Sequence, residues 1–198
     1  MYPTTEVRWF LDGALPAEVT AWFEAVAGAV PWETRTDYYV RPATPDGLGV
    51  KARAGHLEVK RLAEVIGDEA LHERAAGRVE RWRKWSFPLD RSAQLRQGAG
   101  DWVAVGKRRQ KASFAVRSGV VGRVPREEQT RSGCSMEIAE VGAAGRTWWS
   151  VCFEAFGPES EQAGLLRRTA AHVFARAAPP ALGRACSMSY PRWLCACA

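Results

Sequence analysis

Long apolar runs are missing from this chain of 198 residues. No stretch reaches the ~18 consecutive apolar residues that a membrane-spanning helix needs. The amino terminus, MYPTTEVRWF, also has no basic segment followed by an apolar run, as a secretory signal would. We therefore expect a cytoplasmic protein that has no membrane partner.

Cysteine patterns that bind zinc or form disulfide frameworks are missing as well. The number of cysteines is odd, none stands in a C-x-x-C pair, and none has a histidine at zinc-ligand spacing. We expect free thiols at Cys134, Cys152, Cys186, Cys195 and Cys197. The last two, at the carboxyl end, could chelate a soft metal or oxidise, and an inert tail is the alternative.

Familiar catalytic motifs are absent too. The three histidines, His56, His72 and His172, are scattered, and neither a Gly-rich phosphate loop nor a Ser/His/Asp or Cys/His arrangement is present. Positive charge is what the chain does have, because 28 Lys and Arg residues against 22 Asp and Glu give a net charge of +6. That excess favours polyanionic partners such as phosphorylated small molecules, nucleic acid or acidic membrane surfaces, without choosing among them.

Alternation of apolar and polar residues predicts a strand-rich chain. We expect strands over 4–11, 36–41, 48–54, 56–62, 78–87, 101–109, 112–117, 134–141 and 146–156. Amphipathic patterns predict helices over 16–27 and 159–177, and 61–77 has room for a short helix. The segments 88–100 and 119–133 look like loops.

This order of elements predicts one domain, residues 1–198, of the α+β class and mainly β. We expect a closed antiparallel β-barrel of about eight strands with helices packed outside, and a two-sheet sandwich is the alternative. A barrel of that size has room for its side chains or for one small ligand. The identity of the inward side chains therefore decides the function.

The segment GVKARAGHLEVKRL, residues 49–62, raises that question directly. Folded at its central Ala-Gly, it becomes a hairpin in which Val50 faces Val59 on an apolar side and Lys51 faces Glu58 on a charged side. The charged side either is an exposed sheet face or points into a cavity.

Similar charged faces recur on other predicted strands, opposite faces rich in Val, Leu and Trp. Under outer helices the apolar faces would pack outward, and the charged faces would then line the interior. Buried Lys and Arg lose several kcal/mol of hydration unless they are paired, and a polyanion would offset that loss. Carboxylates among them could hold a divalent cation that bridges to phosphate oxygens.

A series of short motifs runs along the chain. They are Thr4-Thr5-Glu6-Val7-Arg8, Lys51-Ala52-Arg53, Lys60, Arg78-Val79-Glu80, Lys107-Arg108-Arg109, Cys152-Phe153-Glu154 and the Ser189-Tyr190 segment. In this order they resemble the motifs of CYTH-type proteins of the triphosphate tunnel metalloenzyme superfamily. That family opens with E-x-E-x-K and continues through R-x-R, R-x-E, K-x-R and E-x-E strands to a terminal Ser-Tyr segment.

The resemblance implies a hydrophilic barrel interior that binds a phosphorylated small molecule carrying a triphosphate or polyphosphate. It assigns phosphate binding to Arg8, Lys51, Arg53, Lys60, Lys107 and Arg109. It assigns catalysis to Glu6 and Glu154, which would hold Mg²⁺ or Mn²⁺ in a phosphohydrolase. Glu137, with Glu80 as the other candidate, could make up for an acid that the motifs have lost. Thr4 and Cys152 stand where the family carries acids. That departure favours the alternative of a non-catalytic binding module with a degraded metal site.

Other readings stay open at this point. Glu6 and Glu154 are equally explained as structural ion-pair partners of arginine. The segment RWRKW, residues 81–85, is the candidate contact in a third hypothesis of nucleic-acid binding, although its tryptophans also suit core packing. The substrate, the metal and the oligomeric state do not follow from the sequence.

Overall fold

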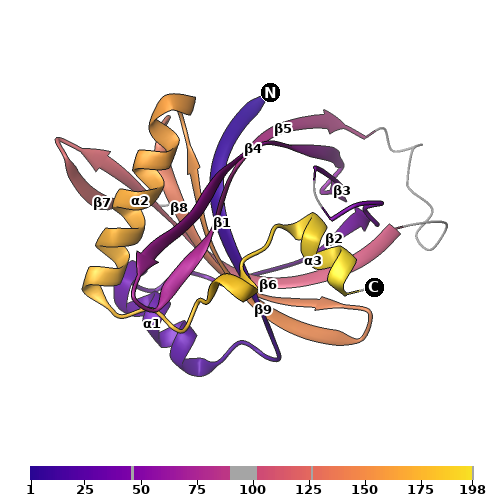
Figure 1. The fold of residues 1–198 in the computed structure, drawn as a ribbon, viewed down its shortest axis with the longest axis horizontal. Coiled ribbons are helices and arrows are strands. Elements are labelled where there is room, and N and C mark those ends of the chain that lie inside the picture. Colours follow the sequence, from indigo (N-terminus) through magenta and orange to yellow (C-terminus); the bar gives the residue numbers. More distant parts are fainter. Residues whose placement is uncertain (46, 90–101, 126, 198) are drawn as a thin grey trace.

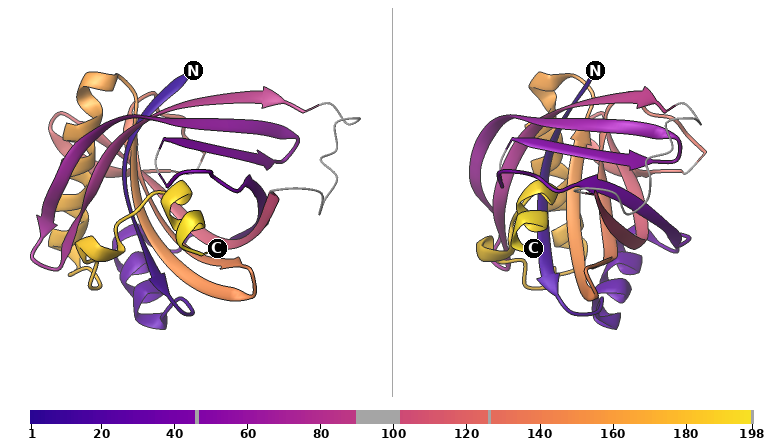
Figure 2. Two further views of the ribbon diagram at one scale, coloured as in Figure 1. Left: turned by 45° about the vertical axis from the view of Figure 1, so that its right-hand side comes forward. Right: turned by 90° about the vertical axis from the view of Figure 1, so that its right-hand side faces the viewer.

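The computed structural model describes residues 1–45, 47–89, 102–125 and 127–197 (Figures 1 and 2). Its elements are β1 (Tyr2–Asp12), α1 (Ala17–Ala27), β2 (Glu33–Val40), β3 (Leu48–Arg53), β4 (His56–His72), β5 (Ala75–Pro88), β6 (Trp102–Arg117), β7 (Val120–Val124), β8 (Gly133–Ala143), β9 (Arg146–Phe156), α2 (Glu159–Arg176), the 3-10 turn η2 (Arg184–Cys186) and α3 (Tyr190–Ala196). None of the described helices is both long enough and apolar enough to cross a membrane.

Eight of the strands form a closed antiparallel barrel. They follow the order β2-β3-β4-β5-β1-β9-β8-β6, and pairing of β2 with β6 closes the ring. The remaining strand, β7, extends β6 as a hairpin beside the ring. The predicted fold, a mainly β antiparallel barrel with helices, is therefore confirmed and the sandwich alternative is not.

The hairpin of β3 and β4 has the predicted register. Val50 lies opposite Val59, and Lys51 lies opposite Glu58. Its two-residue turn has positive φ at both positions, 46° at Ala54 and 75° at Gly55. A turn of this kind matches the right-handed twist of the two strands and so fixes which side chains share a face.

Three expectations along the chain are wrong. The segment 61–77 is not helical, because β4 continues to His72 and β5 begins at Ala75. Three register shifts in the pairing of β4 with β5 interrupt the alternation that would have revealed a strand. The strands expected at 101–109 and 112–117 are one continuous strand, β6, and the expected loop 119–133 contains β7. Most of the expected loop 88–100 lies outside the described residues.

The helices α1 and α2 pack on the outer surface of the barrel, as predicted (Figure 1). The outward side chains of β1, Val7 and Trp9, are fully buried in the core under these helices. Phe23 of α1 and Leu166 of α2 join the same core and are also fully buried. Burial of apolar surface on this side leaves the opposite strand faces to line the interior.

A third helix, α3, was not predicted and lies within the ring of strands (Figures 1 and 2). Its Trp193 stacks on the inward ring of Phe10, with 4.8 Å between centroids and 7° between planes. Ser189 accepts a hydrogen bond from the Arg192 backbone N–H and caps the helix start. A second apolar cluster, separate from the outer core, forms around this helix from Phe10, Tyr39, Val105, Ala139, Val141, Ala143, Trp148, Trp193 and Leu194.

Candidate functional site

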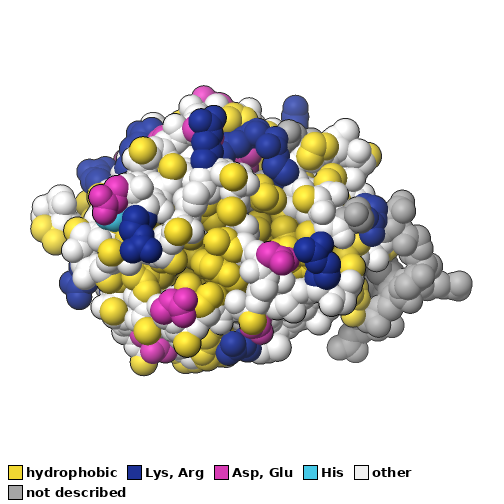
Figure 3. All heavy atoms as spheres, turned by 60° about the horizontal axis from the view of Figure 1, so that its bottom comes forward, with side chains coloured by type: hydrophobic (Ala, Val, Ile, Leu, Met, Phe, Trp, Pro, Cys, Tyr) yellow, Lys and Arg dark blue, Asp and Glu magenta, His cyan; other side chains and the backbone are white. Residues whose placement is uncertain are grey.

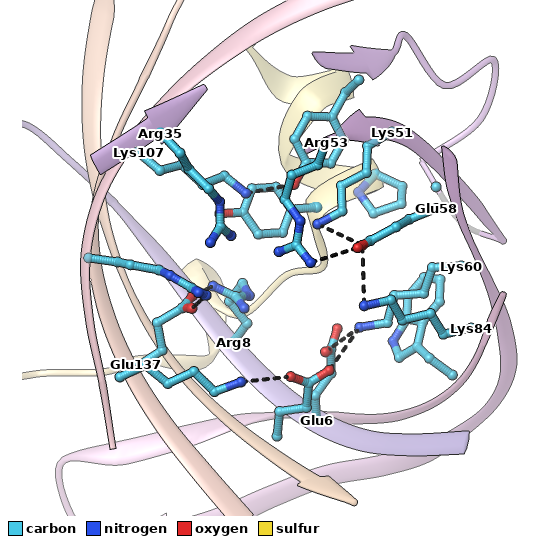
Figure 4. A pocket seen from close by; sticks show the side chains of 18 residues that line it. Glu6, Arg8, Arg35, Lys51, Arg53, Glu58, Lys60, Lys84, Lys107 and Glu137 are labelled. Carbon is cyan, nitrogen blue, oxygen red and sulfur yellow. Dashed lines mark hydrogen bonds and ion pairs between the residues drawn. The ribbon is translucent and has the colours of Figure 1, made fainter. Parts of the chain in front are cut away.

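The rest of the barrel interior is a cavity of about 250 Å³ lined mostly by charged side chains (Figure 4). All eight barrel strands contribute to it, and α3 forms part of its wall. Nine basic residues face it against four glutamates. The lining residues are Glu6, Arg8, Arg35, Tyr39, Gly49, Lys51, Arg53, Glu58, Lys60, Trp82, Lys84, Lys107, Arg109, Lys111, Glu137, Glu154, Tyr190 and Pro191.

Every site residue predicted from the sequence lies in this lining. They are Glu6, Arg8, Lys51, Arg53, Lys60, Lys107, Arg109, Glu137 and Glu154. The hairpin cations do not form an exposed sheet face, because the side chains of Lys51, Arg53 and Lys60 are 19%, 28% and 26% exposed and point into the cavity. The structure brings them together around one cavity, whereas their roles remain predictions.

Several cavity residues were missed. Arg35 lies on β2, which begins at Glu33 and so before the expected strand at 36–41. Asp37 lies within that expected strand and is buried behind the lining, but no role was assigned to it. Lys111 falls between the two strands that were expected in place of β6. Lys84 and Glu58 also line the cavity without having been assigned to the site, and Tyr190 was noted only as part of the Ser-Tyr motif. An unbroken alternation through 102–117 would have revealed Lys111, since it lies two positions beyond Arg109 on the same face.

The distribution of lysines is uneven over the molecule. The chain has five, at positions 51, 60, 84, 107 and 111, and all five line the cavity. Arginines, by contrast, occur both in the cavity and on the outside, where Arg146 and Arg184 are largely exposed. Because lysine is strongly hydrated and prefers the surface, the placement of the whole set inward works against the usual partition.

Asp37 organises one group of these cations. Its carboxylate is fully buried, with Oδ2 2.9 Å from Lys107 Nζ and 3.6 Å from Lys51 Nζ, and Oδ1 accepts a hydrogen bond from Arg35 Nε at 3.0 Å. Burial alone would raise the pKa of Asp37, but the neighbouring cations outweigh it and lower the pKa to about 2. Asp37 therefore stays ionised and is shared among three cations.

Glu58 organises a second group on the hairpin side. It accepts a hydrogen bond from Arg53 Nη2 at 2.7 Å and lies 3.1 Å from Lys51 Nζ and 3.2 Å from Lys84 Nζ. Burial opposes ionisation of Glu58, yet these cations lower its pKa to about 2. Lys51 thus stands between the two carboxylates.

Glu137 holds the two arginines of a third group. Arg8 Nη1 donates to its Oε1 at 3.1 Å, and Arg109 Nη1 donates to its Oε2 at 2.7 Å. Burial would raise the pKa of Glu137, but the two guanidinium groups hold it well below its usual range. This carboxylate is already fully engaged by protein cations.

Glu6 and Glu154 face each other directly across the pairing of β1 with β9. Like charges in that position repel, and Lys60 lies beside both of them. Its Nζ donates to Glu6 Oε2 and is 3.7 Å from Glu154 Oε1. Burial opposes the charge on Glu154, but Lys60 and Lys111 lower its pKa to about 2. One lysine therefore bridges two carboxylates.

The predicted metal site does not fit these residues. Within the part of the chain that the structure describes, no three His, Cys, Asp or Glu side chains are grouped so that they could hold a metal ion. Glu6, Glu154 and Glu137 all direct oxygens to protein cations. Cys152 faces Arg8 across the strands, and burial raises the pKa of its thiol, so it stays protonated. All five thiols are free, as expected.

Two other motifs have structural explanations. Glu80 accepts a hydrogen bond from the Trp82 indole at 3.1 Å and pairs with Arg78 at 2.9 Å, so the Arg78-Val79-Glu80 motif forms an ion pair within β5. The RWRKW segment also belongs to β5, and its side chains divide between two faces. Trp82 is buried at the cavity, whereas Arg81 pairs with Glu64 and lies 3.7 Å from Glu159.

No family model matches this chain, and a search of curated proteins finds no significant relative. The resemblance to CYTH-type proteins therefore rests on the motifs alone and remains a prediction.

Proposed function

We propose that this protein binds a small ligand carrying several phosphoryl groups inside its barrel, as a CYTH-like triphosphate-binding protein. The observation that carries the proposal is that all five lysines and four arginines line one cavity of about 250 Å³ with only four glutamates. Asp37, behind this lining, offsets one further charge. An excess of enclosed cations remains, and a polyanion would neutralise it.

Without a ligand, contacts with aromatic rings stabilise some of these excess positive charges. Lys107 Nζ lies 3.9 Å from the centre of the Tyr190 ring, and the Arg8 guanidinium lies 4.8 Å from the centre of the same ring. Lys60 Nζ lies 5.3 Å from the Trp82 ring. A cation–π contact contributes ~0.5–2 kcal/mol, which is less than the several kcal/mol of hydration that a buried cation loses. Phosphate oxygens would supply the missing interaction.

The spread of the cations favours a chain of phosphates over a single one. The basic residues come from β1, β2, β3, β4, β5 and β6, so they surround the cavity instead of converging on one point. Arginine forks match pairs of phosphate oxygens, and lysines act as movable point charges around them. A ligand with phosphoryl groups in series would contact several of these groups at once.

Nucleic-acid binding on the outer surface has less support. On the face that Figure 3 shows, basic side chains lie in separate groups among acidic ones, and apolar side chains occupy the middle. The cavity itself is below the ~300–1,000 Å³ typical of pockets for drug-sized ligands. A short polyphosphate chain suits that space, and a duplex does not.

Hydrolysis is the further step that the resemblance suggests. Glu6 and Glu154 are adjacent, but they share Lys60, and no metal-binding group accompanies them among the described residues. We therefore propose binding without hydrolysis as the function that this geometry supports best. Five free thiols further support our proposal that the protein works in the cytoplasm.

The test is calorimetric titration with inorganic tripolyphosphate, with EDTA and with Mn²⁺, together with a phosphate-release assay. Arg109→Gln removes a cavity cation, and Arg108→Gln removes its neighbour in β6, which stacks on Trp32 on the outside at 4.1 Å. We expect Arg109→Gln to weaken binding by about 10- to 100-fold, the range of a lost charged hydrogen bond, and Arg108→Gln to leave it nearly unchanged.

The other outcomes separate the alternatives. Absence of binding to the wild type would contradict the proposal. Phosphate release that requires Mn²⁺ and disappears in Glu154→Gln would show that the phosphohydrolase prediction was right. Binding that EDTA does not reduce, without phosphate release, is the result we expect.

A further inference from the structure

Lys51 and Lys107 share one carboxylate inside the cavity. They come from β3 and β6, on either side of β2, and both lie within 3.6 Å of Oδ2 of Asp37. Their side chains are 19% and 4% exposed. The same carboxylate also accepts a hydrogen bond from Arg35. Three cations therefore depend on one buried negative charge.

The other groups around the pair do not fully balance it. Glu58 of β4 lies 3.1 Å from Lys51 Nζ, but it also holds Arg53 and Lys84. Toward Lys107, Glu137 of β8 is taken by Arg8 of β1 and Arg109 of β6. Among the described residues, two phenols also neighbour the pair, Tyr39 of β2 and Tyr190 of α3. Lys107 donates to Tyr39 Oη at 2.6 Å, and burial raises the pKa of both phenols, so they add no negative charge.

This shortage of negative charge makes the two ammonium groups costly to keep protonated. Burial first, and then repulsion from Lys107, lowers the pKa of Lys51 to about 7. Burial also lowers the pKa of Lys107, to about 8, against the attraction of Asp37. Lys60, which bridges two carboxylates of its own, has a raised pKa and stays charged.

We propose that ligand binding in this barrel is coupled to proton uptake by the Lys51 and Lys107 pair. The inference rests on the proposed function, because phosphate oxygens entering the cavity supply the negative charge that the pair lacks. A lysine side chain that is partly deprotonated in the empty cavity then takes a proton from solvent and keeps it while the ligand is bound. No bond other than this N–H forms, and the ligand is unchanged.

The direction of the pH dependence follows from linkage. Well below neutral pH both lysines are already charged in the empty cavity, so binding takes up no proton at them. As pH rises through neutrality, each proton that must be taken up lowers the affinity, by up to tenfold per pH unit. Affinity for a ligand of fixed charge is therefore expected to fall toward mildly alkaline pH.

The test is isothermal titration calorimetry with tripolyphosphate at about pH 8, in two buffers that differ in ionisation enthalpy. The difference in heat gives the number of protons taken up. Lys51→Arg and Lys107→Arg keep the positive charge but cannot release it, because arginine stays protonated. Protonation of tripolyphosphate itself contributes equally to each protein and cancels in the comparison. Lys60→Arg is the matched control, since Lys60 is charged throughout.

We expect the wild type to take up more protons than Lys51→Arg or Lys107→Arg, by up to one proton each, and Lys60→Arg to match the wild type. Equal proton uptake in all four proteins, with binding retained, would overturn the coupling and leave the proposed function standing. Failure of the wild type to bind would overturn both.

A second measurement does not depend on how well the variants fold. Wild-type protein labelled with ¹³C at the lysine ε-carbon gives signals from five lysines, all in the cavity. Two of them should titrate near neutral pH, and tripolyphosphate should move their midpoints upward. Midpoints that all stay near the ordinary lysine value of ~10.4, with and without the probe, would contradict the proposal.

Discussion

The two halves of the barrel interior are built from the same strands and have opposite chemistry. Along β1 the inward side chains change from Glu6 and Arg8 to Phe10, and along β6 they change from Lys107 to Val105. On β8, Glu137 gives way to Ala139 and Val141 in the same manner. The charged half encloses the cavity, and α3 fills the apolar half.

The difference shows that alternation along a strand decides which face a side chain occupies, but not what that face is for. In the apolar half, Trp193 of α3 lies on Phe10 and meets the edge of Trp148 with 5.2 Å between ring centroids. That half is a packed core and is complete in the protein alone. The charged half carries a surplus of cations, which the proposed anionic ligand would balance.

Disruption of α3, the helix that fills the apolar half, should have the largest effect on stability. Trp193 is 2% exposed, and Trp193→Ala should lower the free energy of unfolding by about 3–5 kcal/mol, as expected for deletion of a buried tryptophan. Denaturant unfolding measures the change. Val120→Ala, at a side chain that is 70% exposed, is the control and should stay within about 0.5 kcal/mol of the wild type. A small effect of Trp193→Ala would mean that α3 does not form a core with the barrel.

Within the charged half, the stability of the protein should be most sensitive to loss of the carboxylate of Asp37. Asp37→Asn removes the negative charge that three cations share. It should lower the free energy of unfolding by about 3 kcal/mol at pH 6, the lower end for a broken buried ion pair. The cost should shrink at pH 8, because Lys51 and Lys107 can then lose protons. Asp68→Asn breaks an exposed pair with Arg184 and should cost no more than about 1 kcal/mol. Equal costs in the two variants would contradict a buried charge cluster.

The charged half, unlike the apolar half, should make the stability of the protein depend on pH. Lys51 and Lys107 have lower pKa values in the folded protein than the ~10.4 of an unfolded chain. The unfolded chain therefore binds more protons near neutrality, and the stability of the empty protein should rise from pH 6 to 8.5 by about 1–3 kcal/mol. Unfolding curves at each pH measure this, and Lys51→Arg should flatten the rise. A flat or falling curve in the wild type would count against the lowered pKa values of the two buried lysines.

The smallest effect is expected at the boundary between the halves. The Tyr190 ring contacts Lys107 and Tyr39, but its hydroxyl is buried and has no hydrogen-bond partner among the described residues. Tyr190→Phe keeps the ring and removes an unsatisfied group, so stability should be unchanged or increase by up to about 1 kcal/mol. A clear loss in thermal denaturation would show that the hydroxyl has a partner in solution.

Sequence periodicity was enough to predict the barrel, the register of the hairpin at Ala54 and the convergence of residues such as Arg8 and Lys60. It failed where alternation was interrupted. The register shifts in β4 concealed its second half, and division of β6 into two strands hid Lys111. Arg35 was missed because the start of β2 was placed too late. Asp37 lies within the strand expected at 36–41, but nothing in the alternation marks it as the partner of cations on other strands.

The helix α3 was not predicted either, and the reason is different. The helix α3 has only seven residues, which is too short for a helical period to be recognised. Its position depends on contacts with residues distant in sequence, such as Phe10 and Trp148. Ionisation within the cavity likewise depends on which carboxylate each lysine reaches, as Lys51 and Lys107 show at Asp37. Distances of this kind follow from the closed barrel and not from any local pattern.

The most direct test of the central claim uses the lysine set itself. Carbon-13 spectra of the lysine-labelled wild type would be recorded while tripolyphosphate is added at constant pH and salt. All five lysine signals should shift together with a single saturable affinity, since all five line one cavity. If the folded protein shows no shift in any of them at saturating tripolyphosphate, the barrel does not bind phosphoryl chains.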